Sequence, residues 1–294
     1  METENNKGFP IQAIAIPAVI ATMIFLAIFG ITESDRLRSY PLTAYNIPIP
    51  DDSVSIEHGR RLTHIRGCVD CHGEQMAGSI LQKSLHTGLI AAPNITMGEG
   101  SAILDYSDED LIRVIREGVR PNRKSVIIMP SHKFQVIHQR DLASLISYLR
   151  NTEPVHRTMP QSRINFPMRL YYFVNRKLAL FPANLVKRPV EMPKSTPADR
   201  LTMGRYIASS CVGCHGHHLE GGPIPGAPPS WPEAPALDLD GVAGTWSKQQ
   251  FKEAMTQGIA PDGRHLNEVF MPWPAFGQLT EAEYDLLWEY MQQL

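Results

Sequence analysis

The sequence predicts a mainly α-helical protein in which an N-terminal transmembrane helix is followed by two tandem domains of the same plan. Three observations carry this prediction. An uncharged apolar run covers residues 9–31. The pentapeptide Cys-Val-x-Cys-His occurs twice, at residues 68–72 and 211–215. The segments around the two copies share further residues at matching distances, which indicates an internal duplication of one module.

Each pentapeptide is a C-x-x-C-H sequence, the attachment signature of c-type haem. Because residues i, i+3 and i+4 share one face of a helical turn, Cys68 and Cys71 can form thioethers to one porphyrin while His72 binds its iron. The second copy supplies the equivalent set, Cys211, Cys214 and His215. A zinc site, a redox pair or a disulfide would also use C-x-x-C. All four cysteines of the chain are nevertheless used in two copies with the same trailing histidine, so we predict two covalently bound haem c groups.

The apolar run of residues 9–31 is long enough to span a membrane. At about 1.5 Å per residue, 23 helical residues cross a hydrocarbon core of about 30 Å. A cleaved signal peptide would have a basic start, a shorter apolar core and an A-x-A-like site, whereas the first seven residues here contain two acids and one lysine. We therefore predict a retained, single-span anchor at residues 1–34. The positive-inside count favours the opposite orientation by one charge, because Arg36 and Arg38 follow the span.

The rest of the chain divides into four predicted segments. They are a proline-punctuated tether at 35–54, a first domain at 55–150, an interdomain bridge at 151–196 and a second domain at 197–294. In the first domain we expect a long loop after the pentapeptide, a helix from Ser107 that stops at Gly118, and a last helix at 139–150. In the second domain, Ser247 and Gly258 repeat the same eleven-residue step.

Charge is distributed unevenly along the chain. The net charge is −2, but residues 151–200 carry nine Lys or Arg against three acids, and residues 201–294 carry four against eleven. No basic stripe accompanies a recognition motif, so no nucleic-acid partner is expected. Two interpretations stay open. The acidic domain is either an ordinary solvated surface or a surface that steers a basic redox partner through residues such as Glu281, Glu283 and Asp285.

The bridge has an apolar stripe at near-helical spacing, which makes a free tether a poor interpretation. The stripe comprises Phe166, Leu170, Phe173 and Phe181. It could pack on the first domain, on another subunit or on anionic headgroups.

A methionine is the predicted sixth ligand of each iron. Met129 lies 57 residues after the first motif histidine and Met271 lies 56 after the second. Each precedes a proline, which stiffens the loop that must hold a weak ligand. A thioether there favours the ferrous state and raises the potential. Simple apolar packing is the alternative role, and Met97 and Met255 are rivals that occupy no equivalent positions in the two repeats.

With these residues in place, the sequence resembles class I cytochromes c, twice over. The matching positions are a glycine in the first helix, the C-x-x-C-H, the Met-Pro loop and an aromatic residue in the last helix; outside the motifs they are Gly59, Tyr148, Gly204 and Tyr290. The resemblance implies that each glycine lets the first and last helices cross closely with the aromatic ring at the crossing. It also implies that a proline carbonyl accepts a hydrogen bond from the haem histidine, with Pro93 and Pro235 as candidates. Because c-type haem is attached outside the cytoplasm, it implies haem domains in the periplasm, held by a single-pass anchor in a bacterial inner membrane.

More narrowly, Pro93-Asn94-Ile95-Thr96, residues 106–111, residues 116–121 and the bridge from residue 164 to 182 are similar to the cytochrome subunits of membrane-bound alcohol and gluconate dehydrogenases. Those subunits carry three haem motifs and a C-terminal membrane segment, whereas this chain has two motifs and an N-terminal span. The resemblance implies a membrane-anchored dihaem electron carrier that is not itself an enzyme. Its partners would be other redox proteins or subunits of a respiratory or dehydrogenase complex. The alternatives are the dihaem subunit of a cbb-type haem–copper oxidase and, less favoured because both repeats carry a methionine, a dihaem peroxidase.

Overall fold

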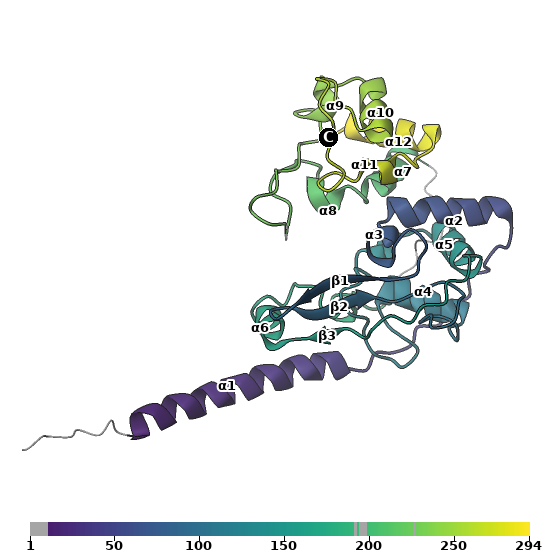
Figure 1. Ribbon diagram of the computed structural model, residues 1–294. Helices are drawn as coiled ribbons and strands as arrows, with labels where there is room; N and C mark the ends of the chain where they lie inside the picture. The colour runs from purple at the N-terminus through teal and green to yellow at the C-terminus, as the bar shows by residue number, and fades with distance from the viewer. Residues whose placement is uncertain (1–10, 191–192, 194–198, 226) are drawn as a thin grey trace, which may run out of the picture.

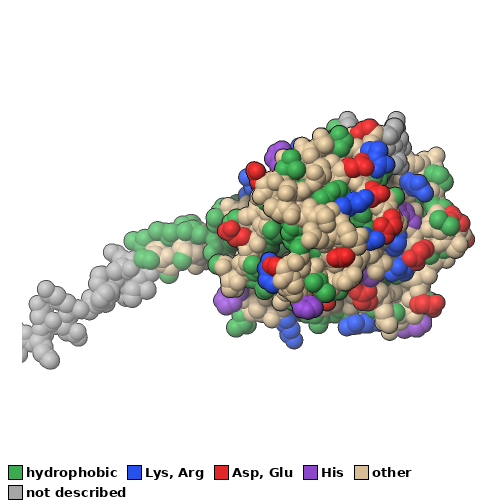
Figure 2. Space-filling view, turned by 90° about the horizontal axis from the view of Figure 1, so that it is seen from above, with side chains coloured by type: hydrophobic (Ala, Val, Ile, Leu, Met, Phe, Trp, Pro, Cys, Tyr) green, Lys and Arg blue, Asp and Glu red, His purple; other side chains and the backbone are tan. Residues whose placement is uncertain are grey.

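The computed structural model describes residues 11–190, 193, 199–225 and 227–294, and it is mainly helical, as predicted. The N-terminal part of helix α1 (Ile11–Leu37) projects from the rest of the molecule, and its C-terminal part runs along the body (Figure 1). Apolar side chains cover it, whereas charged side chains are scattered over the visible face of the body (Figure 2). Within the described residues, α1 is the one helix long and apolar enough to cross a membrane, through its segment Ala15–Leu37. The start of the apolar run at residue 9 and the predicted boundary at residues 196 and 197 lie outside the described residues.

The segment predicted as a tether is non-helical from residue 38 to 52, and it packs on the helical body. The side chain of Tyr40 is buried, and its amide donates to the carbonyl of Arg123 at 3.0 Å. The hydroxyl of Tyr45 donates to the carboxylate of Glu117 at 2.6 Å. These contacts fix the exit of α1 against the body.

The first unit, residues 53–150, is built around the crossing of its first and last helices. Its helices are α2 (Ser53–Ile65), α3 (Cys68–His72), α4 (Asp108–Glu117), the 3₁₀ turn η1 (Phe134–Val136) and α5 (Gln139–Arg150). A Cβ atom at Gly59 would lie 1.9 Å from the carbonyl oxygen of Ser144, so α2 and α5 touch backbone to backbone there. Around the crossing lies a core that includes Leu62, Leu111, Ile112, Leu142 and Ile146.

The second unit, the described residues from 199 to 294, has the same plan. Its helices are α7 (Arg200–Ala208), α8 (Val212–His215), α9 (Val242–Thr245), α10 (Lys248–Gln257), α11 (Trp273–Phe276) and α12 (Glu281–Met291). A Cβ at Gly204 would lie 2.2 Å from the carbonyl oxygen of Leu286, so α7 and α12 repeat the close crossing. The core of this unit includes Ile207, Phe251, Leu287 and Met291, and Ile65 of the first unit joins the same cluster.

The repeat extends to how α4 and α10 begin and end. Ser107 and Ser247 each form a capping box with the third helical residue, so the first amides of each helix are satisfied by side chains. Gly118 and Gly258 end the helices with φ of 66° and 68°, a left-handed conformation that glycine adopts without a Cβ penalty. The boundaries expected from the sequence are confirmed at both helices.

The long loop predicted after the first pentapeptide is wrong in part, because it contains a β-hairpin. Strand β1 (Ser79–Ser84) pairs antiparallel with β2 (Gly88–Ala92), and β2 pairs with the short β3 (Arg163–Ile164) of the bridge. Strand β2 reads Gly-Leu-Ile-Ala-Ala and has one β-branched residue, so its local propensity for strand is low. Pairing with β1 and with the bridge stabilises it instead.

The bridge also packs on the first unit. It contains α6 (Phe166–Val174) and the 3₁₀ turn η2 (Pro182–Asn184). Phe181 is buried in a cluster with Tyr172 and Leu180, against which Ile127 and Ile128 of the first unit pack. The ring of Phe166 lies 4.3 Å from that of Phe25 on α1. The prediction that the bridge is not a free tether is confirmed.

Candidate haem sites

The first pentapeptide forms the short helix α3, framed by two glycines. Gly67 adopts φ of 71° before Cys68, and Gly73 adopts φ of 74° after His72. The Nδ1 atom of His72 lies 2.9 Å from the carbonyl oxygen of Pro93. Since a carbonyl only accepts, Nδ1 carries the proton and Nε2 is left for an iron. Burial lowers the pKa of His72, which favours the neutral imidazole that binds metals.

The second pentapeptide repeats this arrangement on α8. His215 is buried, and its Nδ1 lies 2.8 Å from the carbonyl oxygen of Pro235. Burial lowers the pKa of His215 as well. Gly216 ends the helix with φ of 83°, as Gly73 does in the first copy. The proline acceptors predicted from the resemblance are confirmed for both histidines.

A turn after each histidine is a shared feature that the sequence analysis missed. Met76 and Leu219, each four residues after its histidine, are fully buried and adopt positive φ of 56° and 61°. Two residues later, the amides of Gly78 and Gly221 donate to the carbonyls of the respective histidines at 2.9 and 2.8 Å. The pattern His-Gly-x-x-apolar-x-Gly stands in both copies and could have signalled this turn.

The four cysteines suit covalent attachment. Cys68 and Cys211, the first cysteine of each motif, are half-buried, and burial raises the pKa of each thiol to about 12. Cys71 is half-buried and Cys214 is exposed. Two cysteine thiols, a histidine with a free Nε2 and the glycine turns together fit a porphyrin held by two thioethers and one nitrogen.

The two predicted methionine ligands stand in similar turns. The amide of Ser131 donates to the carbonyl of Met129 at 2.8 Å, and that of Trp273 to the carbonyl of Met271 at 2.7 Å. Pro272 has φ of −74° and ψ of 62°, the geometry of an inverse γ-turn, in which the locked φ of proline is favourable. Both methionines are half-buried.

Two other side chains are alternatives for the sixth ligand of an iron. Met255, a rival of Met271, is buried in the core on α10. His132 lies in the loop after Met129, and its Nδ1 is buried with no hydrogen-bond partner in the described part of the chain. Burial, with Lys133 nearby, lowers the pKa of His132. His132 is therefore a second candidate for the sixth ligand in the first unit.

The methionine loops of the two units are supported differently. Ile128 adopts φ of 66°, which is strained for a β-branched residue, and its amide donates to the carbonyl of Leu180 in the bridge at 3.1 Å. Pro182 packs over Gly118, within 3.3 Å of the position that a Cβ would occupy there. In the second unit, the indole of Trp273 covers the equivalent Gly258. A proline of the bridge thus covers the glycine that ends α4, and a tryptophan of the second unit covers the glycine that ends α10.

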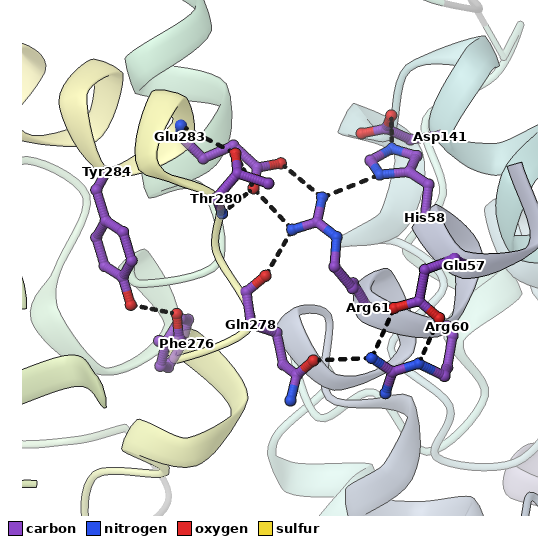
Figure 3. Close-up of polar contacts among 10 residues, drawn as sticks. All are labelled: Glu57, His58, Arg60, Arg61, Asp141, Phe276, Gln278, Thr280, Glu283 and Tyr284. Atoms are coloured by element: carbon purple, nitrogen blue, oxygen red, sulfur yellow. Dashed lines mark hydrogen bonds and ion pairs between the residues drawn. The ribbon is translucent and has the colours of Figure 1, made fainter. Parts of the chain in front are cut away.

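An ion pair joins the two units (Figure 3). Arg61 on α2 donates to the carboxylate of Glu283 on α12 at 2.9 Å and to the backbone carbonyl of Gln278 at 2.5 Å. Arg60 donates to the side chain of Gln278 at 3.1 Å. The side chains of Arg61 and Glu283 are 16% and 22% exposed, so the pair is largely shielded from solvent. Burial disfavours ionisation of Glu283, but hydrogen bonds from Arg61 and the Thr280 amide outweigh it and lower its pKa.

A second set of contacts joins the segments that precede the two pentapeptides. Arg66, two residues before Cys68, donates to the hydroxyls of Ser209 at 2.7 Å and Ser210 at 2.9 Å. Its guanidinium lies 4.6 Å from the ring centroid of Tyr206, a cation–π contact. The hydroxyl of Tyr206 donates to Asp141 of the first unit. Since Ser210 adjoins Cys211, the two attachment segments lie side by side.

The acidic residues that the steering interpretation singled out are paired within the protein. Glu281 pairs with Lys252, Glu283 with Arg61, and Asp285 with Lys248 at 2.7 Å. Glu283 also caps α12 and belongs to the interface between the units. Part of the negative charge of the second unit is thus neutralised locally.

Comparison with known proteins shows which sequences this chain resembles. The family model for cytochrome c matches residues 203–294. The cytochrome c subunit of gluconate 2-dehydrogenase from Pantoea cypripedii is 26% identical over 179 residues, which is 57% of this chain and 40% of the relative. The cytochrome c subunit of alcohol dehydrogenase (quinone) from Gluconobacter oxydans (strain 621H) is 24% identical over 56% of this chain and 35% of the relative. The fructose dehydrogenase cytochrome subunit from Gluconobacter japonicus is 25% identical over 55% and 34%.

The chain spans between about a third and two fifths of the length of these relatives. The predicted resemblance to cytochrome subunits of dehydrogenases is confirmed. A cytochrome c domain implies covalently bound haem c and electron transport. Residues 203–294 therefore match the cytochrome c family, and the chain is similar to the cytochrome c subunits of gluconate, alcohol and fructose dehydrogenases.

Proposed function

We propose that the chain is a membrane-anchored dihaem c-type cytochrome that relays electrons between redox partners, as a subunit of a respiratory or dehydrogenase complex. The two units would be tandem class I cytochrome c domains. One observation carries the proposal above the others. The first unit repeats three features of the second unit: the histidine–proline hydrogen bond, the turn after it and the glycine crossing. The second unit is the one that the family model for cytochrome c matches.

Each unit would hold one haem through two cysteines, a histidine and a methionine. Cys68, Cys71, His72 and Met129 would serve the first, and Cys211, Cys214, His215 and Met271 the second. Bound haem iron carries one electron by alternating between the ferric and ferrous states. Pro93 and Pro235 orient the histidines, and the Met-Pro turns would hold the thioethers for the irons. With both axial positions filled, neither iron offers a substrate site, so the chain would be a carrier and not an enzyme.

The interface between the units supports a relay. Contacts of Arg66 with Ser209 and Ser210 place the two attachment segments together. Lys133, beside the Met129 loop, lies 3.9 Å from the position of a Cβ on Gly213 within the second motif. Electrons could thus pass between the units without a docking step. Replacing Arg66 by alanine should slow reoxidation of one haem by the other, while Arg60→Ala, at the edge of the interface, should change it less.

Haem content tests the count of two. The purified chain should hold two haems per polypeptide by pyridine haemochrome assay and intact mass. Cys68→Ala with Cys71→Ala should leave one haem, and so should Cys211→Ala with Cys214→Ala. A native chain with a single haem would reduce the proposal to one cytochrome domain.

The methionine assignment has its own spectroscopic test. The oxidised protein should show the far-red methionine-to-iron charge-transfer band. Met271→Ala should remove the part that belongs to the second unit, and Met129→Ala the rest. If Met129→Ala leaves the spectrum unchanged while His132→Ala alters it, His132 is the ligand of the first unit.

Three relatives that are dehydrogenase subunits support the choice of partner. We propose a dehydrogenase as the electron donor, α1 as a single-pass anchor in a bacterial inner membrane, and both units in the periplasm. Mild solubilisation followed by mass spectrometry of the co-purifying chains tests the partner. A co-purifying haem–copper oxidase would instead support the cbb-type alternative.

A further inference from the structure

The bridge helix α6 packs along the apolar part of α1. The rings of Phe166 and Phe25 lie 4.3 Å apart, and Phe166 and Leu170 line a shallow apolar groove with Thr22, Phe25 and Ile28 among others. Phe25 precedes the end of α1 at Leu37 by 12 residues, which is about 18 Å along a helix. The bridge therefore reaches far down the segment that is apolar enough to span a membrane.

Polar contacts fix how far α6 reaches. Arg169 donates to the Thr32 hydroxyl at 3.0 Å and to the Glu33 carboxylate at 2.9 Å. Arg176, near the end of α6, donates to Asp35 at 2.5 Å. The charges of α1 are thus paired within its last two turns, and the contact of Phe166 lies about two turns deeper. The N-terminal end of α6, at Phe166, therefore lies beside the apolar part of α1, beyond these polar contacts.

The outer face of α6 is apolar and uncovered. Tyr171 and Val174 are 56% and 76% exposed, and Leu170 and Phe173 are also exposed. Leu85, at the tip of the β1–β2 hairpin, is 87% exposed and lies beside α6, because its carbonyl accepts from the side chain of Asn165 at 2.9 Å. Clustered exposed apolar side chains of this kind mark interaction surfaces.

We propose that α6 and the tip of the β1–β2 hairpin form a membrane-contacting surface that dips into the same bilayer leaflet as the end of α1. This rests on the proposed function, in which α1 spans the membrane. We assign lipid to this surface because it continues the apolar face of α1. When α1 spans the bilayer, Phe166 and Leu170, which pack on it, enter the bilayer as well. Arg176 and the exposed Lys177 stand just beyond α6, where anionic headgroups would meet them.

A photoactivatable lipid tests this on the native chain. The full-length protein is reconstituted in phosphatidylcholine–phosphatidylglycerol vesicles that contain a lipid with a diazirine in its acyl chain, and adducts are mapped by mass spectrometry. We expect adducts on α1, on residues 166–174 and on the peptide with Leu85, at least severalfold above those around Val269, an apolar residue of the second unit that is 67% exposed. Adducts on α1 without adducts on α6 would overturn the inference, leave the anchor standing and point to a protein that covers this face. No adducts on either would overturn the anchor itself.

Matched cysteine variants give a second measurement. Val174→Cys and Val269→Cys add one thiol each at similarly exposed positions, beyond the four motif cysteines that haem would occupy. In vesicles, a water-soluble maleimide should modify the thiol at position 174 at least tenfold more slowly than the thiol at 269. Equal rates would contradict contact with lipid at α6.

Discussion

The crossing of α7 and α12 at Gly204 leads to a prediction about the stability of the second unit. In Gly204→Ala, the new methyl carbon would lie 2.2 Å from the carbonyl oxygen of Leu286 and 2.6 Å from the Cβ of Tyr290. Real contacts of this kind are essentially never shorter than about 3 Å, so the helices must separate by about 1 Å. Overpacking of this sort costs about 3 kcal/mol at its usual upper end, and the better helix propensity of alanine returns about 1 kcal/mol. We expect a net loss of about 2 kcal/mol.

The assay is urea unfolding of the holoprotein in mild detergent, followed by tryptophan fluorescence. All four tryptophans lie in the second unit, at positions 231, 246, 273 and 288, so the signal reports that unit. With a slope of about 2 kcal/mol per M, the midpoint should fall by about 1 M.

Gly213→Ala is the matched control, because the nearest atom to a Cβ there is the flexible end of Lys133 at 3.9 Å, and the first motif carries Asp70 at the same position. Its midpoint should not fall by more than about 0.3 M, which corresponds to about 0.6 kcal/mol. If Gly204→Ala unfolds at the native midpoint, the backbone contact between the helices is not as close as described.

Two further predictions concern the interface and the loop after the first motif. The lowered pKa of Glu283 means that its ionised form stabilises the fold above the unfolded pKa of about 4.3, and that this stability is lost as pH falls through the lower folded pKa. In Glu283→Gln, the urea midpoint should therefore drop less between neutral and acidic pH than in the native chain, and an equal drop would contradict this role. Asn94→Ala removes the buried amide that donates to the carbonyls of Val155 and Arg157, and should cost about 3 kcal/mol by circular dichroism. The tryptophan midpoint should not move, since Asn94 lies in the first unit.

The residues proposed to bind the cofactor could be found from the sequence because each belongs to a local pattern. C-x-x-C-H sets its own helical turn, and serine caps with glycine stops set the bounds of α4 and α10. Gly59 and Gly204 were found by their places in the repeat, and the structure gives the reason, a helix crossing that admits no Cβ.

What the sequence did not predict depends on contacts between distant segments. Strand β2 pairs with β1 and also with β3, more than 70 residues later, which no local propensity reveals. The positive φ values of Met76 and Leu219 are held by burial in the turn after each histidine. The pairing of Glu283 with Arg61 joins residues that lie in different repeats, so its charge could be counted from the sequence but not assigned a partner.

The different supports of the two methionine loops have a consequence for how the chain can be divided. The second unit carries its own cover in Trp273, so its methionine loop should keep this cover when the unit is produced as a separate piece. The methionine loop of the first unit is supported by Leu180 and Pro182, which lie beyond the last helix of that unit. A truncation after residue 150 would therefore uncover the loop. The two units thus differ in their support: the methionine loop of the second is covered from within the unit, and that of the first by the segment that connects the units.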